Sequence, residues 1–376
     1  LAKKVDSKGR EKLLDEGNVS TLFLERNLQL LKDGGRVGII LPETYFHAPN
    51  QQMVRNFIFK HNIQWIIDLP HNTFRPHNNA KCIAIVIQKN RPQQNNVHMA
   101  VAEYIGHDHN GKPLYKYDEA KQTYTNEILD DTNIIIEEIK QKRINPNYKT
   151  KYIFDVEFSD IIKTGILVPR YYWNSKKEEI DEKARKEDIT MVSLKTLIEK
   201  KIISFFDGNG SPASEFKGTG DIPYIRVKDI VNWQIYKDPT ALIPDSEFKR
   251  LYKPEKALKE KDILYVRRGS YRIGSVAMAS PYDLKVILTR EILVLRVNSP
   301  ENEYNLTPEY LLYALSHQLT FEQANNKIFI DTTLPNIADR WKEIEIPIYN
   351  DKDKFNLINS KVKQVVKSQW DSLKEI

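Results

Sequence analysis

The stretch LLKDGGRVGIILPE, residues 30–43, decides the fold of the first part of this 376-residue chain. Residues 20–33 carry leucines at helical spacing, which predicts an amphipathic helix. Gly34 and Gly35 end that helix, because glycine accepts the left-handed conformation in which many helices terminate. Residues 36–41 form an unbroken apolar run, which is typical of a strand buried on both faces of a sheet. A helix followed directly by such a strand indicates an α/β domain.

The same alternation continues along the first part of the chain. Residues 51–61 predict a second helix, because their apolar positions again recur at helical spacing. Short apolar runs predict strands at 64–69, 82–88 and 97–105. We therefore assign residues 1–105 to an α/β domain, which would be a partial sheet with its helices.

The pattern changes beyond that domain. Residues 106–188 are more polar and predict a linker with connecting helices. Residues 189–350 contain short β-rich runs separated by turn signals and a few helices, which predicts a mostly β, α+β domain. The last residues, 351–376, have apolar side chains near one face of a charged C-terminal helix. We expect strands at 222–227, 262–266, 274–279 and 291–297, and helices at 130–142, 176–186 and 307–317.

The composition is that of a globular protein, with 40% hydrophobic and 29% charged residues. No apolar run approaches the roughly 20 residues that a membrane span needs, and no signal peptide opens the chain. The single cysteine, Cys82, excludes an internal disulfide framework. The eight histidines show no metal-ligand spacing. We therefore expect a cytoplasmic protein with no metal site and no membrane partner.

The net charge of +6 is mild, but it is unevenly distributed. Residues 221–290 contain 14 Lys and Arg against 9 Asp and Glu, an excess of five that accounts for nearly all of the total. A local basic excess is what a phosphate-binding surface needs. A solvated lysine-rich face has the same composition, so charge alone leaves both interpretations open.

An ordered series of motifs within residues 21–89 resembles part of a known catalytic domain. The motifs are FLER, LLKDGGRVGIILPE, WIIDLP, TFRP and NAKCIAIVI, at residues 23–26, 30–43, 65–70, 73–76 and 79–87. They resemble the second half of the catalytic domain of amino-group DNA methyltransferases, which include the modification subunits of type I restriction-modification systems and their fused relatives. This resemblance implies transfer of a methyl group from S-adenosylmethionine to adenine N6 in a specific duplex.

The resemblance also suggests a base pocket. Methylation of adenine N6 requires the base to leave the duplex and enter a pocket. Phe74 matches the aromatic residue that stacks on the extruded base in this family, although a loop-anchoring core aromatic would also fit. Glu43 follows a strand at the edge where open α/β sheets bind ligands. Its carboxylate would face the pocket or cap the next helix.

Two motifs of this family do not occur in the sequence: the glycine-rich turn that holds S-adenosylmethionine, and the catalytic Asn-Pro-Pro-Tyr/Phe loop. Both precede the matched motifs in the family, and the chain begins with Leu1 rather than Met. We therefore expect a fragment that does not transfer methyl groups alone. FDGNG at 206–210 and NPNY at 145–148 resemble these motifs. The first runs into Ser-Pro and the second lacks a proline, so we interpret neither as a site.

A second resemblance covers residues 193–348. The motifs are GDIPYIRVKDI, DILYVRRGS, IGSVA, TPEYLL, TLPNI and IEIPI, at residues 220–230, 262–270, 273–277, 307–312, 333–337 and 344–348. They resemble the target-recognition domains of type I specificity subunits. The resemblance implies double-stranded DNA as a partner, together with a restriction or specificity subunit.

Basic and aromatic residues in this second domain are the candidate DNA contacts. They are Arg226, Lys228, Arg267, Arg268, Tyr271, Arg272 and Arg290. Arginine binds guanine bidentately in the major groove or binds phosphate, and we predict phosphate contacts for Arg226 and Lys228. A surface salt bridge is the alternative for each arginine.

Two other functions remain open on the sequence alone. The chain would also suit a non-catalytic, sequence-specific DNA-binding protein in which the α/β part has lost its activity. An RNA-modifying relative is a further alternative, but the β-rich domain lacks an evident row of aromatic residues for stacking single-stranded bases.

Overall fold

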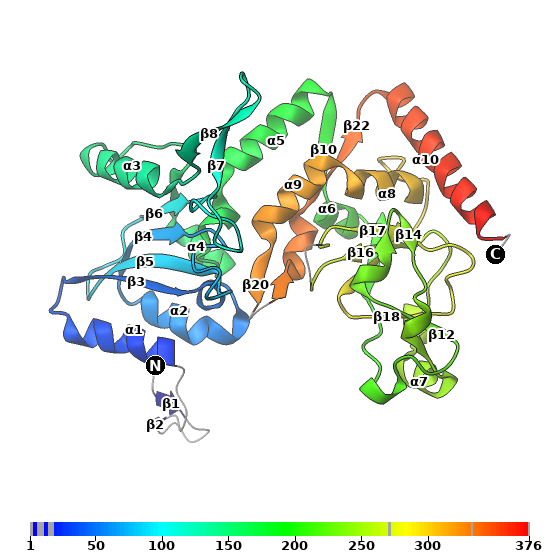
Figure 1. Cartoon of the computed structure of the whole chain (residues 1–376), viewed down its shortest axis with the longest axis horizontal. Coiled ribbons are helices and arrows are strands. Elements are labelled where there is room, and N and C mark those ends of the chain that lie inside the picture. Colours follow the sequence, from blue (N-terminus) through cyan, green and yellow to red (C-terminus); the bar gives the residue numbers. More distant parts are fainter. Residues whose placement is uncertain (1–2, 6–10, 14–18, 270–271, 332–333, 375–376) are drawn as a thin grey trace. The chain divides into compact units, whose positions relative to one another are not determined.

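The computed structural model describes residues 3–5, 11–13, 19–269, 272–331 and 334–374. The chain is a mixed α/β protein with several small sheets, and it forms two compact units (Figure 1). The first unit comprises Leu1–Ser175 and Phe329–Thr333; the second comprises Lys176–Ile328 and Leu334–Ile376. A short segment from late in the sequence therefore belongs to the first unit.

The first unit is built on a five-stranded sheet. Its order is β3 (Arg36–Pro42), β5 (Cys82–Gln88), β4 (Asn62–Asp68), β6 (Asn96–Val101) and β9 (Ile153–Glu157). Because β5 is antiparallel to both neighbours, β3 and β4 run in the same direction, and β6 is parallel to β4. The carboxyl ends of β3, β4 and β6 therefore lie at one edge of the sheet.

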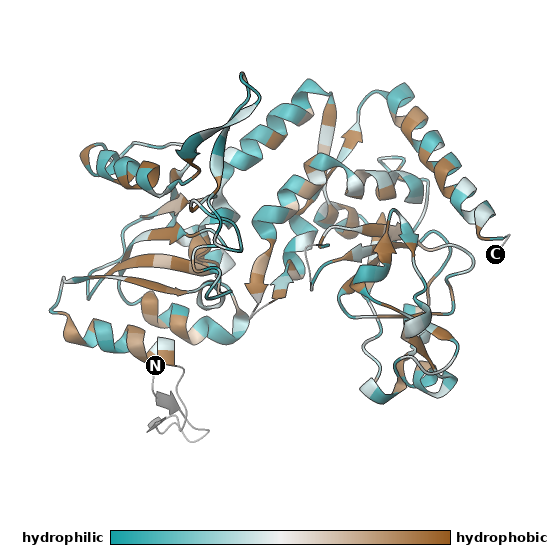
Figure 2. Ribbon diagram, viewed as in Figure 1, coloured by the Kyte–Doolittle hydropathy of each residue, from teal (hydrophilic) through white to brown (hydrophobic). Residues whose placement is uncertain are grey.

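Helices cover both faces of this sheet. Leucines of α1 (Val19–Leu30) join the main core together with apolar residues of α2 (Gln52–Ile58) and α4 (Phe158–Thr164). A smaller cluster on β4 and β6 includes Ile135 of α3 (Thr132–Ile144). The strands are brown and the helix surfaces largely teal in Figure 2, as expected for a sheet between helices. The other elements of this unit are β1 (Lys3–Val5), β2 (Glu11–Leu13), η1 (Glu43–Phe46), η2 (Pro49–Gln51), β7 (Tyr115–Asp118), β8 (Thr123–Ile128), η3 (Pro169–Tyr172) and β20 (Phe329–Asp331).

Two features of the sheet differ from the sequence prediction. β3 was expected to be buried on both faces, but it is the last strand of this sheet and Ile40 is 51% exposed. The apolar run indicated burial, whereas the described part of the chain covers only one face of β3. The segment 106–188 was predicted to be a linker, but within it β9 pairs with β6. Ile153, Phe154 and Val156 are buried there and add a strand to the sheet.

The second unit contains several small sheets. Its largest has the order β11 (Ile203–Asp207), β19 (Ile292–Val297), β16 (Ile263–Val266) and β17 (Val276–Met278). The remaining strands are β10 (Ile189–Ser193), β12 (Ile222–Ile225), β13 (Ile230–Val231), β14 (Gln234–Ile235), β15 (Leu242–Ile243), β18 (Ile287–Leu288), β21 (Leu334–Asn336) and β22 (Glu345–Tyr349). The helices are α5 (Asn174–Lys186), α6 (Leu194–Glu199), α7 (Asp245–Leu251), α8 (Pro308–Ser316), α9 (Gln318–Lys327) and α10 (Lys352–Ser372), and the short 3-10 turns are η4 (Ser214–Phe216), η5 (Val227–Asp229), η6 (Pro239–Ala241), η7 (Pro254–Lys256) and η8 (Ala338–Glu343).

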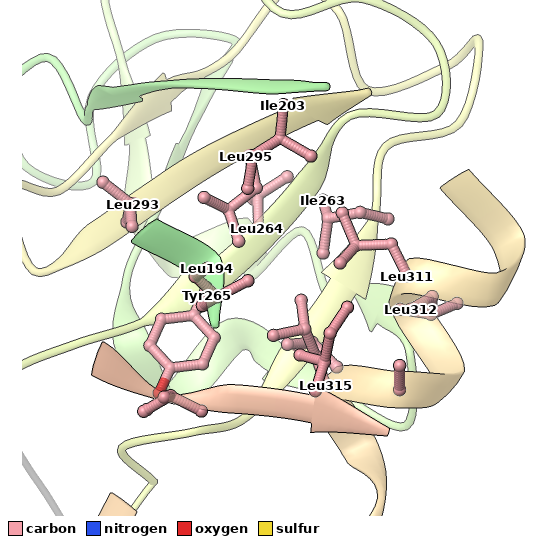
Figure 3. Close-up of a cluster of buried hydrophobic side chains, with 14 of the residues drawn as sticks. Leu194, Ile203, Ile263, Leu264, Tyr265, Leu293, Leu295, Leu311, Leu312 and Leu315 are labelled. Atoms are coloured by element: carbon pink, nitrogen blue, oxygen red, sulfur yellow. The ribbon is translucent and has the colours of Figure 1, made fainter. Parts of the chain in front are cut away.

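The core of the second unit forms where the four-stranded sheet meets α8. Leu264, Leu295 and Leu311 are fully buried in this cluster, which Figure 3 shows in close-up. Each buried leucine contributes roughly 1.5–3 kcal/mol of transfer free energy. α8 begins as predicted, because the Thr307 hydroxyl accepts a hydrogen bond from the Tyr310 backbone N–H at 3.1 Å. This cluster fixes the strands that carry the candidate arginines.

The C-terminal helix α10 packs on the same core. Phe355, Val362 and Val366 are its buried residues, and the Phe355 ring stacks on Tyr310 with centroids 3.9 Å apart. The predicted apolar face of this helix therefore packs within its own unit. In the described ranges of the chain, no helix is both long and apolar enough to cross a membrane.

Candidate functional site

Polar side chains gather at the edge of the first unit where β3 and β4 end. Glu43 begins η1 directly after β3, and Asp68 is the last residue of β4. Lys81 precedes β5, and its carbonyl accepts a hydrogen bond from the Glu43 backbone N–H at 2.9 Å. Arg170 joins this group from η3. Open α/β sheets bind ligands at this edge, so it is the candidate site of the unit.

Asp68 is the centre of a buried ion network. Its carboxylate accepts two hydrogen bonds from the Arg170 guanidinium, at 2.8 Å from Nε and 2.6 Å from Nη2, and another from the Lys81 ammonium. Burial pushes the pKa of Asp68 upward, but Arg170 and Lys81 outweigh burial and hold it at about 2. Asp68 therefore stays ionised at neutral pH and keeps both cations in place.

Glu43 is buried beside this network, with 1% of its surface exposed. Its Oε1 atom accepts a hydrogen bond from the Ile330 backbone N–H at 2.8 Å. Its Oε2 atom is buried and has no hydrogen-bond partner among the residues that the structure describes. Burial raises the pKa of Glu43, although Arg170 and Lys81 oppose the rise. The side chain makes no cap for η1, so the capping alternative is not what the structure shows.

Phe74 lies in a turn-rich loop that follows β4. The Thr73 hydroxyl donates to the Pro70 carbonyl at 2.6 Å, and the Phe74 carbonyl accepts from the Asn78 N–H at 2.8 Å. The Phe74 side chain is half-buried and does not belong to the hydrophobic clusters found in the described part of the chain. It is thus an aromatic side chain that the core does not use. The loop follows the same strand end that carries Asp68.

The sequence did not indicate that β20 contributes to this edge. Phe329 is fully buried in the main core of the first unit, and its ring lies 4.8 Å from that of His47. The backbone N–H of Ile330 donates the hydrogen bond that Glu43 Oε1 accepts. Arg170 was also missed. A carboxylate at a strand end would have indicated Asp68, but no local pattern relates it to Arg170, which lies 102 residues away.

In the second unit, two candidate arginines lie beside the glycine-rich loop 206–210. Arg267 forms an ion pair with Asp207 at 3.0 Å, and its backbone N–H donates to the Glu291 carbonyl at 3.0 Å. Gly210 packs against Arg290, because a Cβ atom there would lie 3.6 Å from the arginine Nε. Arg290 is exposed and Arg267 half-buried. The fold therefore brings these two arginines to one loop cluster.

This glycine-rich loop does not fit the cofactor that its sequence suggests. A Cβ atom at Gly208 would lie 2.1 Å from the Thr289 carbonyl oxygen, so the loop packs directly on protein backbone. Its amides at Gly208 and Gly210 donate to the carbonyls of Ile292 and Leu288. Those groups are then unavailable to S-adenosylmethionine. The NPNY stretch at 145–148, which resembles the catalytic loop, directly follows α3 and begins with its C-cap residue, Asn145.

Arg226 and Lys228 are held by acidic neighbours. The Arg226 guanidinium binds the carboxylates of Asp229 and Asp238, with its Nε 2.9 Å from Asp229 Oδ2. Lys228 is more exposed and lies 3.1 Å from Asp238. Arg226 therefore has a structural ion pair of the kind proposed as its alternative role. Lys228 is the residue of this pair that solvent, and hence a phosphate, reaches more freely.

The remaining candidates flank the turn between β16 and β17. Arg268 is half-buried, and its backbone bridges to Asn336. Arg272 donates to the Ile230 carbonyl at 3.2 Å. Tyr271 lies outside the described residues. A Cβ atom on Gly269 would approach Val227 of η5 to 3.8 Å. The segments that carry Arg226, Arg267 and Arg272 thus converge on one region of the second unit.

The first unit is thus an α/β unit with polar side chains at one strand-end edge, and the second is a mainly β unit with converging basic loops. Residues 2–181 match the model of the N-6 DNA Methylase family. These residues are therefore similar to N-6 DNA methylases, as the sequence resemblance predicted. A comparison with curated proteins found no match.

Solved structures of restriction-modification proteins also match. The type IIG restriction endonuclease BpuSI is 13% identical, with 93% of this chain and 44% of that chain covered and a TM-score of 0.40. The methyltransferase subunit of a type I system from Streptococcus thermophilus is 20% identical over 42% of this chain and 31% of that one, with a TM-score of 0.30. The HsdS subunit from Thermoanaerobacter tengcongensis is 16% identical over 54% and 46%, with a TM-score of 0.31. The chain therefore spans less than half the length of each of these structures.

Proposed function

We propose that this chain is part of a restriction-modification DNA methyltransferase that recognises a specific duplex and methylates adenine N6. Residues 1–105 would be the C-terminal part of the catalytic domain, and residues 189–350 the target-recognition domain. Residues 106–175, which add β9 to the first sheet, would belong with the catalytic part, and the helix over 351–376 would complete the second unit. The match of residues 2–181 to N-6 DNA methylases is the observation that carries this proposal.

The strand-end edge of the first unit suits one wall of a base pocket. Phe74 offers a half-buried ring outside the core, and an extruded adenine regains on such a ring the stacking that it loses on leaving the duplex. Glu43 Oε2 is a buried acceptor without a partner among the described residues. Because the Glu43 side chain is only 1% exposed, we place it behind the pocket wall rather than in contact with the base.

The methyl donor would be S-adenosylmethionine, bound by residues that complete the catalytic domain. The surface around β3 supports a completed sheet. β3 lacks a second neighbour within the described strands, and Phe23 and Leu30 of α1 are 59% and 69% exposed. An open strand edge beside exposed apolar side chains favours pairing with another strand. Without the residues that bind S-adenosylmethionine, we expect this chain to bind DNA but not to transfer a methyl group.

The second unit would read the duplex. Arg267 and Arg290 lie on one loop cluster, where guanidinium groups can reach guanine edges or phosphates. Lys228 is placed to contact phosphate. In a complete enzyme a restriction or specificity subunit would be a further partner.

Selection from random duplexes tests this function. The chain is incubated with randomised double-stranded DNA at near-physiological salt, and the retained molecules are sequenced. We expect one short motif to be enriched, and we expect an Arg267→Ala/Arg268→Ala variant to lose it. Each bidentate arginine contact that reads a base is worth roughly 1–3 kcal/mol of discrimination, so one lost contact reduces preference by roughly fivefold to 150-fold.

Two other outcomes would separate the alternatives. Retention without any motif, falling steeply as salt rises, would mean phosphate attraction alone and would contradict target recognition. A longer protein that carries both the cofactor turn and the catalytic loop can be tested in the same way. If it enriches one short DNA sequence but leaves the adenines of that sequence unmethylated, the non-catalytic DNA-binding alternative is favoured.

A further inference from the structure

Arg75, in the loop after β4, carries a guanidinium group that the described part of the chain leaves without a partner. The side chain is half-buried, and its Nε atom is buried with no hydrogen-bond partner among the described residues. No carboxylate among these residues forms an ion pair with it. A buried N–H group without an acceptor is costly, so this group suits an acceptor that the chain does not itself supply.

The turns of this loop fix where Arg75 lies. The Arg75 backbone N–H donates to the Asn72 carbonyl at 2.9 Å, and the Asn78 N–H donates to the Phe74 carbonyl at 2.8 Å. These bonds hold Arg75 directly after Phe74, the aromatic residue of the proposed base pocket. Consecutive Cα atoms lie about 3.8 Å apart, so the guanidinium is within reach of the sugar-phosphate backbone of a base that stacks on Phe74.

The strand end that carries the loop is rich in positive charge. Lys81 donates to the carbonyl of Leu69, the residue after β4, and Lys81 and Arg170 share the single carboxylate of Asp68. The carboxyl group of Glu43 beside them has a raised pKa, chiefly because it is buried. These surroundings favour the approach of an anion.

The positive charge extends to the first residue of the loop, His71. Its pKa is lowered by partial burial of the ring and also by the charges of Arg75, Lys81 and Arg170. The charge contribution has the sign of a positive local potential. A positive potential in a partly enclosed site attracts anionic ligands.

A second loop brings another cation to the same place. A Cβ atom on Gly111 would lie 3.1 Å from Pro76 Cδ, so its turn packs against the residue that follows Arg75. The Asp108 carboxylate stabilises this turn by accepting the Lys112 backbone N–H at 2.9 Å. The Lys112 side chain is exposed and forms no ion pair with a described residue.

We propose that Arg75 binds a phosphodiester group of the target strand next to the extruded adenine, with Lys112 at the rim of the same site. This inference rests on the proposed function and adds a DNA contact in the first unit. Arginine binds phosphate through two parallel hydrogen bonds, and phosphate oxygens are acceptors of the kind that its buried Nε lacks. Phe74 on the base and Arg75 on the phosphate would together fix one nucleotide.

A dinucleotide tests this site without any duplex. The probes are d(ApA), which carries one charged phosphodiester, and its methylphosphonate analogue, which has nearly the same shape but no charge. The NMR signal of the Arg75 Nε–H group, assigned by its absence in Arg75→Gln, reports binding directly. In the wild type we expect d(ApA) to shift this signal and to bind about tenfold more tightly than the neutral analogue, as for one hydrogen bond to a charged group.

Three variants assign this preference to the charge of Arg75. Arg75→Gln should bind both probes alike, and Arg75→Lys should restore part of the preference. Because Arg75 has no partner among the described residues, neither variant should lower the unfolding temperature. Arg36→Gln is the matched control, because Arg36 is also exposed to solvent and begins β3, at the other end of that strand from the candidate site. It should keep the full preference.

Three results of the dinucleotide experiment would overturn the proposal. They are a wild type that does not bind d(ApA), a wild type that binds both probes equally, and an Arg75→Gln variant that keeps the preference for the charged probe. None of these results depends on sequence recognition by the second unit.

A second arm uses the duplex enriched by selection, with an abasic site opposite each adenine in turn so that the base leaves the stack easily. Phosphates are replaced one at a time by methylphosphonate. At one position next to an adenine, we expect wild-type binding to fall about tenfold and Arg75→Gln binding to stay unchanged. An enriched duplex without such a position would leave target recognition intact and refute the Arg75 contact. If no duplex is enriched, target recognition fails, and the dinucleotide still decides this site.

Discussion

The two units use charge in opposite ways. The first buries a carboxylate, Asp68, with the equally buried Lys81 and the partly exposed Arg170 around it. The second keeps its basic residues near the surface, as in the pair between Lys228 and Asp238. Charges inside a protein are weakly screened, so a buried network depends on every member. Surface pairs are screened by water and salt, so their members are free to exchange partners with a ligand.

This difference separates a rigid site from an adaptable surface. A fixed edge suits a pocket that must hold one base in one orientation, because its groups need no rearrangement on binding. The ion pair of Arg267 with the exposed Asp207 suits DNA, since phosphate can replace this acidic neighbour without leaving a buried charge. The following substitutions test that contrast, from the largest expected effect to the smallest.

Asp68→Asn should cause the largest loss of stability. The amide is close in size to the carboxylate but removes the charge that binds both Lys81 and Arg170, and breaking a buried pair costs about 3–5 kcal/mol. Urea unfolding measures the change, with exchange of the β4 amides assigning it to the first unit. Glu137→Gln, in an exposed pair with Lys140 of the same unit, should change stability by less than about 0.5 kcal/mol. Equal effects would mean that burial does not distinguish the two pairs.

Removing the hydroxyl group from two buried tyrosines of the second unit should change stability differently. The Tyr310 hydroxyl donates to the Pro347 carbonyl at 3.3 Å and accepts from the Tyr349 N–H at 3.1 Å. Tyr310→Phe leaves these groups unsatisfied and should cost about 1–3 kcal/mol. The Tyr265 hydroxyl is buried with no partner among the described residues, so Tyr265→Phe should be neutral or stabilise by about 1 kcal/mol. Thermal unfolding of both variants tests the contrast, which a loss in Tyr265→Phe would contradict.

Glu43 should make the stability of the first unit depend on pH in the direction opposite to that of Asp68. Its pKa is raised in the folded protein from an ordinary value of 4.5, chiefly by burial. The folded state then binds the proton more tightly, so stability falls as pH rises from about 4.5 through the raised pKa. Asp68 has a lowered pKa of about 2, and its contribution is lost as pH falls toward that value.

Glu43→Gln cannot ionise and should remove the first of these trends. Its stability relative to the wild type should increase between about pH 4.5 and neutral pH. Denaturation midpoints measured across this range test the sign. A constant difference would mean that Glu43 does not titrate differently in the folded and unfolded states.

Lys228→Ala should have the smallest effect, and only on DNA binding. Loss of one phosphate contact should weaken binding to all duplexes alike and reduce the slope of log affinity against log salt by about one. Lys374→Ala is the matched control, because Lys374 forms an exposed pair with Asp371 in the same unit but outside the converging loops. A change of sequence preference in Lys228→Ala would instead assign it to base reading.

Much of the local structure follows from the sequence. The apolar run at 82–88 forms β5 with the predicted bounds, and the runs at 36–41 and 64–69 form β3 and β4 within two residues. Thr307 caps α8 as expected. These features depend on neighbours in sequence, through side-chain periodicity and capping groups that act within one helical turn. The glycine-rich loop at 206–210 runs into an irregular segment at 211–213, as its following Ser-Pro pair predicts.

The tertiary structure alone decided how distant segments meet. Nothing local places β5 between β3 and β4, or β9 beside β6. Arg170 reaches Asp68 across 102 residues, and Ile330 reaches Glu43 across 287. Such pairs form because a buried charge or backbone group must find a partner anywhere in the fold. Sequence periodicity determined the elements and their order, whereas satisfying buried polar groups and apolar surface determined which ends, edges and late segments came together.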